Sequence, residues 1–322
     1  MEDDAIEYKY VYGPVPSRRF GRSLGVDVTA LKTCCQDCVF CQLGPTTKKT
    51  VERREYVRTE AVLAELKQWL ASGGWADYIT LSGSGEPTLH SRFGEILEFI
   101  RSNTDIPPAL LTNGALLYLP EVREAASAAR VVKVSVSAWD QVSFEWVNRP
   151  HSYLRFAQVI RGLKLFRDTY RGQLWIEVFL VLGMNTMSDE VERLAKIIGD
   201  LTPDRIHLNT AVRPPAEAFV QPLIKERMRA LSRQFQPAAD VISEFSKHPS
   251  KNQIADQDTI FGMLQRRPCT AKQITAGFGM NLSEVLKHLE VMVRNGSVQP
   301  KRTNTEIYYT VTKQENEELQ TI

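Results

Sequence analysis

The stretch KTCCQDCVFCQLG, residues 32–44, places four cysteines within eight positions. Two registers can be drawn through it: Cys34, Cys38 and Cys41, or Cys35, Cys38 and Cys41. Either register offers three thiolates on one short loop, which can hold three corners of a [4Fe–4S] cube, whereas a pure electron carrier usually supplies a fourth cysteine. The missing ligand would leave one iron open to a substrate or a cofactor, as an open position does at catalytic zinc sites.

Other uses of these cysteines fit the rest of the chain less well. Disulfide frameworks are typical of small secreted proteins, but this chain has 322 residues and an odd number of cysteines, five. A zinc ribbon needs a second pair of ligands, and the only cysteine outside the loop is Cys269. The sequence therefore favours an iron–sulfur cluster over a disulfide or a zinc site.

Length and composition indicate a soluble enzyme. The chain has 322 residues, 43% of them hydrophobic, which is enough for one large core and a small second domain. Its formal net charge of +2 gives no overall attraction to nucleic acid. The N-terminal stretch MEDDAIEYKY lacks the apolar segment of a secretory signal, and no stretch reaches the roughly 20 apolar residues that span a bilayer. We therefore expect a cytoplasmic protein with no membrane association.

From about residue 20 to residue 215, short β-rich runs alternate with stretches of helical period, which predicts an α/β fold with a parallel sheet. The predicted strands are SLGVDVT (23–29), YITLSG (78–83), PALLTNG (108–114), VVKVSVSA (131–138), LWIEVFLVLG (174–183) and RIHLNTAV (205–212). Apolar residues at helical spacing predict helices over 62–70, 156–166 and 191–198, and a further helical stretch around 222–235.

Two of these strands alternate apolar and polar side chains, although a parallel strand covered on both faces is usually apolar throughout. The fourth has Val132, Val134 and Val136 on one face and Lys133, Ser135 and Ser137 on the other; the sixth opposes Ile206, Leu208 and Val212 to Arg205, His207, Asn209 and Arg213. Because flanking helices need the apolar face, the polar face should line an interior that holds a large ligand. The candidate substrate-binding residues are Lys133, His207, Asn209 and Arg213. The alternative role for these polar residues is an internal network of salt bridges and hydrogen bonds that involves Glu177. The alternative fold is a mixed sheet with one solvated face.

The C-terminal part, from Thr259 onward, differs in pattern. Three short helical segments, within 258–267, 270–279 and 281–296, precede SVQPKRTNTEIYYTV (297–311), which looks like two strands turning near Asn304. This order predicts a winged helix-turn-helix. From Asn252 to Ile322 eight Lys/Arg face eight Asp/Glu, which disfavours strong duplex binding and leaves nucleic acid, a peptide or protein, and dimerisation as alternatives. The predicted domains are 1–240, a linker at 241–256, and 257–322.

The cysteine loop follows the first predicted strand and SGSGEPTLH (82–90) follows the second. With Phe40 before Cys41, LLTNG at 110–114 and SVSAWD at 135–140, residues 10–240 resemble the radical S-adenosylmethionine (radical SAM) superfamily. The resemblance implies a partial (β/α)6 TIM-like barrel. It also favours Cys34, Cys38 and Cys41 as ligands of a [4Fe–4S] cluster, with Cys35 as a spare thiol.

In that superfamily, S-adenosylmethionine chelates the open iron and is cleaved reductively to a 5′-deoxyadenosyl radical, which abstracts hydrogen from a substrate. The resemblance therefore implies both cofactors and a low-potential electron donor, flavodoxin or ferredoxin. The residues that match its cofactor-binding positions are Phe40, Gly83, Ser84, Gly85, Glu86, Asn113, Ser135, Ser137 and Asn185.

Within the superfamily, GPVPSRRFGRSLGVDVT (13–29) and NTAVRPP (209–215) resemble the branch related to wyosine-tRNA synthases. The tricyclic-base-forming enzymes of that branch carry additional cysteines for a second cluster, which this chain lacks. The substrate therefore stays unidentified. A further expectation is either a basic rim or an ordinary solvated charged surface, formed by Arg18, Arg19, Arg22, Lys48, Lys49, Arg53, Arg54 and Arg58. The rival hypothesis is a redox-sensing regulator in which the cluster controls a DNA-binding winged helix.

Overall fold

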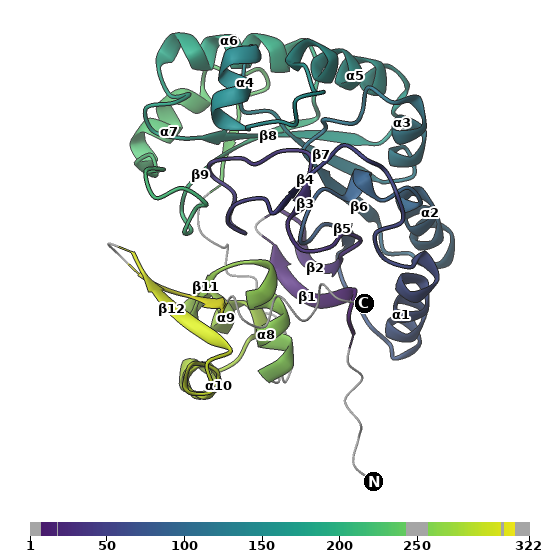
Figure 1. Cartoon of the computed structure of the whole chain (residues 1–322), viewed down its shortest axis with the longest axis vertical. Coiled ribbons are helices and arrows are strands. Elements are labelled where there is room, and N and C mark those ends of the chain that lie inside the picture. Colours follow the sequence, from purple (N-terminus) through teal and green to yellow (C-terminus); the bar gives the residue numbers. More distant parts are fainter. Residues whose placement is uncertain (1–7, 18, 243–256, 304–305, 313–322) are drawn as a thin grey trace.

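The computed structural model describes residues 8–17, 19–242, 257–303 and 306–312. In this part of the chain the main sheet has eight strands. In their order across the sheet they are β1 (Val11–Ser17), β2 (Gly21–Val26), β5 (Tyr78–Leu81), β6 (Pro108–Thr112), β7 (Val131–Ser135), β8 (Gln173–Leu180), β9 (Arg205–Thr210) and β10 (Asp240–Val241). All neighbours run parallel except β1 and β2, which are antiparallel (Figure 1).

The six predicted strands are all present, as β2 and β5 to β9, and the prediction of an α/β fold with a parallel sheet is confirmed. Two further strands of the main sheet were missed. β1 contains Gly13, Pro14 and Pro16, which argue against a strand in sequence but are tolerated at the edge of a sheet. β10 has only two residues, too few for a periodic signal.

Helices connect the parallel strands and lie along the outer face of the sheet (Figure 1). They are α1 (Thr59–Ala71), α2 (Phe93–Asn103), α3 (Pro120–Ala126), α4 (Gln141–Val147), α5 (Phe156–Thr169), α6 (Ser188–Gly199) and α7 (Lys225–Ser232). The helices predicted over 62–70, 156–166 and 191–198 lie within α1, α5 and α6, and the stretch predicted around 222–235 is the shorter α7. α2, α3 and α4 were not predicted.

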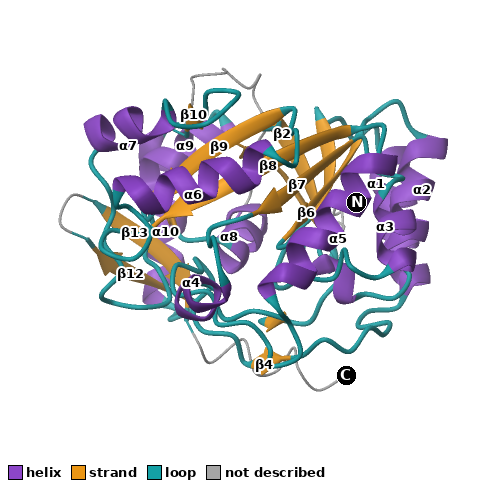
Figure 2. Ribbon diagram, turned by 90° about the horizontal axis from the view of Figure 1, so that it is seen from above, coloured by secondary structure: helices purple, strands orange, loops and turns teal. Residues whose placement is uncertain are grey.

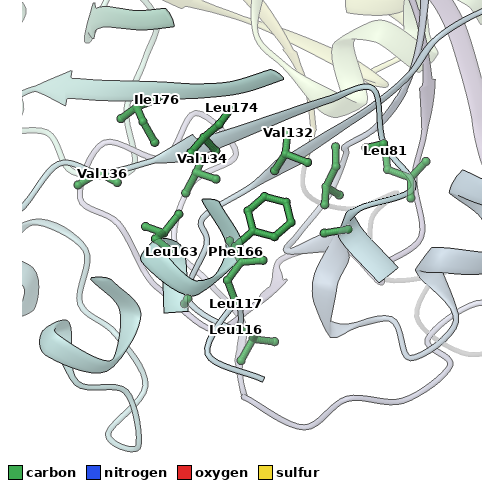
Figure 3. Close-up of a cluster of buried hydrophobic side chains, with 14 of the residues drawn as sticks. Leu81, Leu116, Leu117, Val132, Val134, Val136, Leu163, Phe166, Leu174 and Ile176 are labelled. Atoms are coloured by element: carbon green, nitrogen blue, oxygen red, sulfur yellow. The ribbon is translucent and has the colours of Figure 1, made fainter. Parts of the chain in front are cut away.

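The main core lies between the sheet and these helices. Val132 and Val134 of β7 face Leu163 and Phe166 of α5, and all four side chains are fully buried (Figure 3). Each such side chain contributes about 1.5–3 kcal/mol relative to an exposed one. The opposite face of β7 carries Lys133, so the alternation predicted for this strand is observed.

The sheet curls so that distant strands meet on its inner side (Figure 2). Phe20, in the turn before β2, stacks on Trp175 of β8 with ring centroids 5.0 Å apart. In a flat sheet, β2 and β8 would be four spacings of about 4.8 Å apart. The inner face is therefore enclosed, and the alternative of a sheet with one solvated face does not hold.

The C-terminal elements form a second cluster with its own buried side chains. Its helices are α8 (Gln257–Arg266), α9 (Ala271–Phe278) and α10 (Leu282–Arg294); its antiparallel sheet has the order β11 (Cys269–Thr270), β13 (Ile307–Val311), β12 (Val298–Arg302). Val15 of β1 shares the hydrophobic cluster of these elements, and Tyr12 packs against it. This C-terminal unit thus lies against the outer edge of the main sheet (Figure 1). The predicted turn at Asn304 falls outside the described residues.

Helix α10 is apolar on more than one side. Val285 and Leu289 are buried, but Leu282, Leu286 and Val293 are 36–43% exposed. The helix is thus too apolar on its outer side for a fully solvated face. Among the described helices none has both the length and the apolar character needed to cross a bilayer.

Gly162 lies where α5 packs closely against the chain beneath it, so a substitution there tests this contact. A Cβ at Gly162 would lie 2.4 Å from the backbone nitrogen of Tyr118, which cannot move aside as a side chain can. We expect Gly162→Ala to lower the free energy of unfolding by about 1–3 kcal/mol, although alanine favours a helix by about 1 kcal/mol. Urea unfolding measures this.

The matched control is Gly199→Ala at the end of α6, where a Cβ meets nothing within 4 Å. We expect it to leave stability unchanged or raise it by up to about 1 kcal/mol. Equal effects of the two substitutions would contradict the packing argument.

Candidate functional site

The cysteine loop lies at the carboxyl edge of the parallel strands, where the loops after β5 and β6 also end, and where α/β proteins usually bind their ligands. Two short strands anchor it, β3 (Thr33–Cys34) and β4 (Lys48–Lys49), which pair in parallel. The end of α4 supports its far side, since the amide of Val39 donates to the carbonyl of Val147 at 3.1 Å.

Three nitrogen donors approach the cysteine sulfurs, and one of them, Asn113 Nδ2, contacts two, since it also lies 3.2 Å from the Sγ of Cys35. Asn113 Nδ2 lies 3.5 Å from the Sγ of Cys34, Asn148 Nδ2 lies 3.4 Å from that of Cys38, and Lys32 Nζ lies 3.1 Å from that of Cys41. The three cysteines are partly exposed, and all five cysteines are free thiols. Donors of this kind favour the thiolate form that binds iron, but at Cys38 burial and the neighbouring thiolates outweigh the Asn148 donor and raise the pKa above its ordinary value.

Cys35 has a different environment. Its side chain is fully buried, and its thiol hydrogen-bonds Cys34, which lowers the pKa of Cys34 and, together with burial, raises the pKa of Cys35 well above its ordinary value. Cys34 is therefore the better thiolate of the two. This favours the register Cys34, Cys38 and Cys41.

The donor set fits a cluster better than a single ion. No three His, Cys, Asp or Glu side chains among the described residues gather closely enough to hold one metal ion. The sulfurs of a cubane each bind a different iron, so they need not converge on one point. Three partly exposed cysteines, each within reach of an N–H donor, are consistent with that arrangement.

The loop after β5 is packed directly against the cysteine loop. The amide of Lys32 donates to the carbonyl of Ser84 at 2.7 Å, and the amide of Glu86 donates to the carbonyl of Thr33 at 3.0 Å. A Cβ at Gly85 would lie 2.0 Å from that Thr33 oxygen, and one at Gly83 would overlap Asp27. The two glycines are thus required by the close approach of backbones.

Glu86 connects this loop to the end of β6. Its carboxylate is buried and accepts hydrogen bonds from Thr112 Oγ1 at 2.5 Å, the amide of Asn113 at 2.8 Å, and the amide and hydroxyl of Thr88. Burial raises its pKa against the effect of these donors. The side chain is therefore committed to holding the loops together.

The structure brings several of the other predicted cofactor residues together. Asn113, Ser135 and Ser137 line one narrow pocket beside Gln36 of the cysteine loop. Asn185 lies apart from it: the side chain is fully buried, and its Nδ2 donates to the carbonyls of Ser137 and Phe179 at 2.9 and 2.8 Å. Asn185 thus braces the ends of β7 and β8 and presents no free group to a ligand.

Phe40 packs inward. Its ring stacks on Phe179 of β8, with centroids 4.1 Å apart and an interplanar angle of 8°. This contact holds the cysteine loop against the inner face of the sheet at Phe40, which stands between Cys38 and Cys41 in the sequence.

The predicted substrate residues have different hydrogen-bond and ion-pair partners. Lys133 and His207 are buried inside the curled sheet, where Lys133 Nζ lies 2.9 Å from Glu177 Oε1. Arg213 instead donates to Gln42 of the cysteine loop at 2.7 Å. Asn209 accepts a hydrogen bond from the amide of Thr210 at 3.0 Å. All four side chains are buried, and Lys133 takes part in the internal ion pair that the sequence allowed as the alternative.

Three residues of this region were missed or misplaced by the sequence analysis. Arg19, expected on a surface rim, reaches the interior and pairs with Glu177, whereas Arg18 of the same predicted rim lies outside the described residues. Lys32 and Asn148 contact cysteine sulfurs. Lys32 stands two positions before Cys34 and could have been noticed, but nothing in the sequence connects Asn148 to a loop 110 residues away.

His207 makes a testable difference to the pH dependence of stability. Burial, with the nearby Arg19 and Lys133, lowers its pKa to about 3. The folded protein therefore keeps the ring neutral, whereas the unfolded chain takes up a proton below pH about 6.5. The contribution of the neutral, buried His207 to the free energy of unfolding is therefore complete above about pH 6.5. It is lost as the pH falls toward the pKa of His207 in the folded protein, about 3.

We expect the wild type to lose about 2 kcal/mol more stability than His207→Gln between about pH 7.5 and about pH 5. Urea unfolding under the same reducing conditions measures both proteins. An equal loss in the two would contradict a neutral, buried His207.

Comparison with known proteins places this geometry in a family. Residues 28–210 match the model of the Radical SAM superfamily. A Brachyspira hyodysenteriae protein named GTPase Obg is 33% identical over 95% of this chain and 46% of its own length. The UPF0026 protein MJ1312 of Methanocaldococcus jannaschii is 34% identical over 66% of each chain, and a UPF0026 protein of Helicobacter pylori is 30% identical over 93% of this chain and 96% of its own. The chain thus spans about half the length of the first of these relatives.

Two solved structures share the fold at low sequence identity. A radical SAM methyltransferase from Sphaerobacter thermophilus aligns over 70% of this chain and 67% of its own, with a TM-score of 0.51 and 16% identity. SuiB of Streptococcus suis, bound to S-adenosylmethionine, aligns over 67% of this chain and 49% of its own, with a TM-score of 0.50 and 14% identity. Since the family model covers more than half of the sequence, the chain belongs to the radical SAM superfamily, whose enzymes use a [4Fe–4S] cluster and S-adenosylmethionine.

Proposed function

We propose that this protein is an enzyme that cleaves S-adenosylmethionine reductively at a [4Fe–4S] cluster held by Cys34, Cys38 and Cys41. The cofactors would supply a 5′-deoxyadenosyl radical that takes hydrogen from a substrate. The observation that carries the proposal is the set of three sulfurs on one loop, each within reach of an N–H donor, beside the packed loop of Gly83, Ser84, Gly85 and Glu86.

In this proposal, residues at different positions contact different parts of the cofactor. The backbone of residues 83–86 would receive the methionyl amine, and Asn113, Ser135 and Ser137 would contact the rest of the cofactor from the narrow pocket that they line. Asn113 would serve both the cofactor and the Cys34 sulfur, because it already contacts that sulfur. The inward packing of Phe40 on Phe179 would keep water from the inner side of the loop.

The substrate would lie on the inner side of what we propose is a partial (β/α)6 barrel, extended by β1 and β10. Arg19, Lys133 and His207 line that interior around Glu177, so its polar groups suit a substrate with hydrogen-bonding or anionic groups. Arg213 and Asn209 would act nearer the cysteine loop. Enzymes of this superfamily need an electron donor, and we propose flavodoxin or ferredoxin.

The C-terminal unit supports a winged helix-turn-helix, since its order of three helices and a three-stranded antiparallel sheet is that of the fold. We propose that residues 257–322 form this domain, that 1–240 form the barrel domain, and that 241–256 link them. The third helix, α10, pairs its Arg294 with Glu290 and exposes Leu282 and Leu286. An apolar, charge-balanced surface favours a peptide or protein partner over nucleic acid.

The same surface argues against the rival hypothesis of a DNA-binding redox regulator, which needs a basic recognition helix. The matches to enzymes of the superfamily give that hypothesis no support either.

Relationship to the wyosine-tRNA synthase branch stays a proposal resting on residues 13–29 and 209–215. The GTPase name of the Brachyspira relative is not carried over, because this sequence contains no G-x-x-x-x-G-K-[ST] phosphate-binding loop.

Single cysteine substitutions test the proposal. After anaerobic reconstitution, we expect Cys34→Ala, Cys38→Ala and Cys41→Ala to lose the cluster and 5′-deoxyadenosine formation, because each removes one of three ligands. Cys35→Ala is the matched control and should keep both. Iron and sulfide content, Mössbauer spectra and product analysis with dithionite and S-adenosylmethionine are the measurements.

Because turnover can depend on the missing substrate, a second measurement is needed. Adding S-adenosylmethionine to the reduced protein should change the electron paramagnetic resonance spectrum of the cluster. A full cluster that shows neither this change nor 5′-deoxyadenosine would refute the proposed function.

The Lys32 ammonium makes a further prediction about the cluster. A cation beside the Cys41 sulfur favours the more negative, reduced cluster. We expect Lys32→Met to lower the reduction potential on the order of 59 mV, which corresponds to about 1.4 kcal/mol for one electron. Lys48→Met, on the exposed strand β4, is the control. An unchanged potential in Lys32→Met at equal iron content would contradict a direct interaction.

A further inference from the structure

The C-terminal unit contacts the cofactor end of the main sheet at more than one point: Tyr308 donates to the carbonyl of Val212 after β9, and Arg266 extends toward the loop after β5. Arg266, the last residue of α8, extends toward β1 and β2 and is 12% exposed. Its guanidinium lies 4.1 Å from the ring centroid of Tyr12, and its Nε lies 3.8 Å from Asp27 Oδ2. Its Nη atoms donate to the backbone carbonyls of Lys9 and Gly262 at 3.3 and 3.0 Å, which fixes the direction of the side chain.

Asp27 in turn holds the loop after β5. Its buried Oδ2 accepts hydrogen bonds from the amide of Ser84 at 3.0 Å and from the Ser84 hydroxyl at 2.5 Å, while Oδ1 faces Thr29. Gly83 lies so close that a Cβ there would be 2.3 Å from Asp27 Cγ. The carboxylate thus sets the position of both residues.

Tyr12 contacts the same loop at Ser82. Its hydroxyl donates to the carbonyl of Ser82 at 3.2 Å, and its ring fills the space above Gly25, where a Cβ would lie 2.0 Å from the ring. Burial raises the pKa of this hydroxyl, so it stays a donor. Both supports of residues 82–84, a carboxylate and a phenol, therefore rest against one guanidinium.

We propose that Arg266 is a positioning residue for S-adenosylmethionine, acting through Asp27 and Tyr12 on residues 82–84. The inference rests on the proposed function, in which this loop receives the methionyl amine. A buried carboxylate that loses its cation is strongly disfavoured and draws in water or changes its partners. Without Arg266, Asp27 would hold Ser84 less firmly, and the cofactor would bind a loop that is no longer fixed beforehand.

The test compares three variants of the reconstituted full chain. Arg266→Met keeps a long side chain over Tyr12 without the charge, Arg266→Lys keeps the charge, and Arg294→Met removes an exposed arginine of α10 that pairs only at the surface. We expect the Kd for S-adenosylmethionine, measured by equilibrium dialysis, to rise about 10–100-fold in Arg266→Met, the range typical of groups that orient a binding residue. It should be partly restored in Arg266→Lys and unchanged in Arg294→Met, with iron content equal in all three.

A double-mutant cycle with Asp27→Asn separates positioning from loss of structure. Asp27→Asn leaves Arg266 and its backbone hydrogen bonds in place, so the C-terminal unit stays docked, and limited proteolysis verifies this. We expect Asp27→Asn to raise the Kd by itself and Arg266→Met to add little to it, because both act on one pathway. Additive effects, or a wild-type Kd in Arg266→Met, would overturn the proposal. Failure of the wild-type holoprotein to bind S-adenosylmethionine would instead refute the proposed function.

Discussion

The candidate site depends on the contact between two loop backbones, one carrying the cysteines and the other the glycines. Two hydrogen bonds, from the amides of Lys32 and Glu86 to the carbonyls of Ser84 and Thr33, hold the loops against each other. Gly85 is the residue that permits this distance, because any side chain there would overlap the Thr33 oxygen. With the loops fixed, the Glu86 carboxylate extends the connection to β6 and brings Asn113 beside Cys34. The geometry of the cluster cysteines and of the cofactor loop is therefore one structural unit.

Sequence reasoning recovered the elements that have a strong local signal. The six central strands carry either apolar runs or clean alternation, and the cysteine spacing needs no tertiary information. β1 was missed because Gly13, Pro14 and Pro16 remove the local signal for a strand, while its pairing with β2 and its contact with the C-terminal unit stabilise it. Local propensity was overridden there by tertiary packing.

The contacts at the site that the sequence did not predict have the same origin. Arg19 looks like surface charge in PVPSRRFGRS, and only the curl of the sheet reveals that its partner is Glu177, on the far side of the interior. The contact of Asn148 with Cys38 and the bracing role of Asn185 depend on which loops meet at the carboxyl edge. Residue type and strand position predicted the chemistry of the region, whereas the partner of each polar side chain was set by three-dimensional packing.

The covering of β1 by the C-terminal unit also bears on how copies of this protein meet one another. An open strand at the rim of a sheet offers a row of free N–H and C=O groups to a neighbouring molecule, which leads to aggregation. Here Pro14 and Pro16 take two N–H groups out of that row, and the helices of the C-terminal unit pack over the same strand. The unit therefore protects colloidal solubility at this rim of the molecule, independently of any partner it binds.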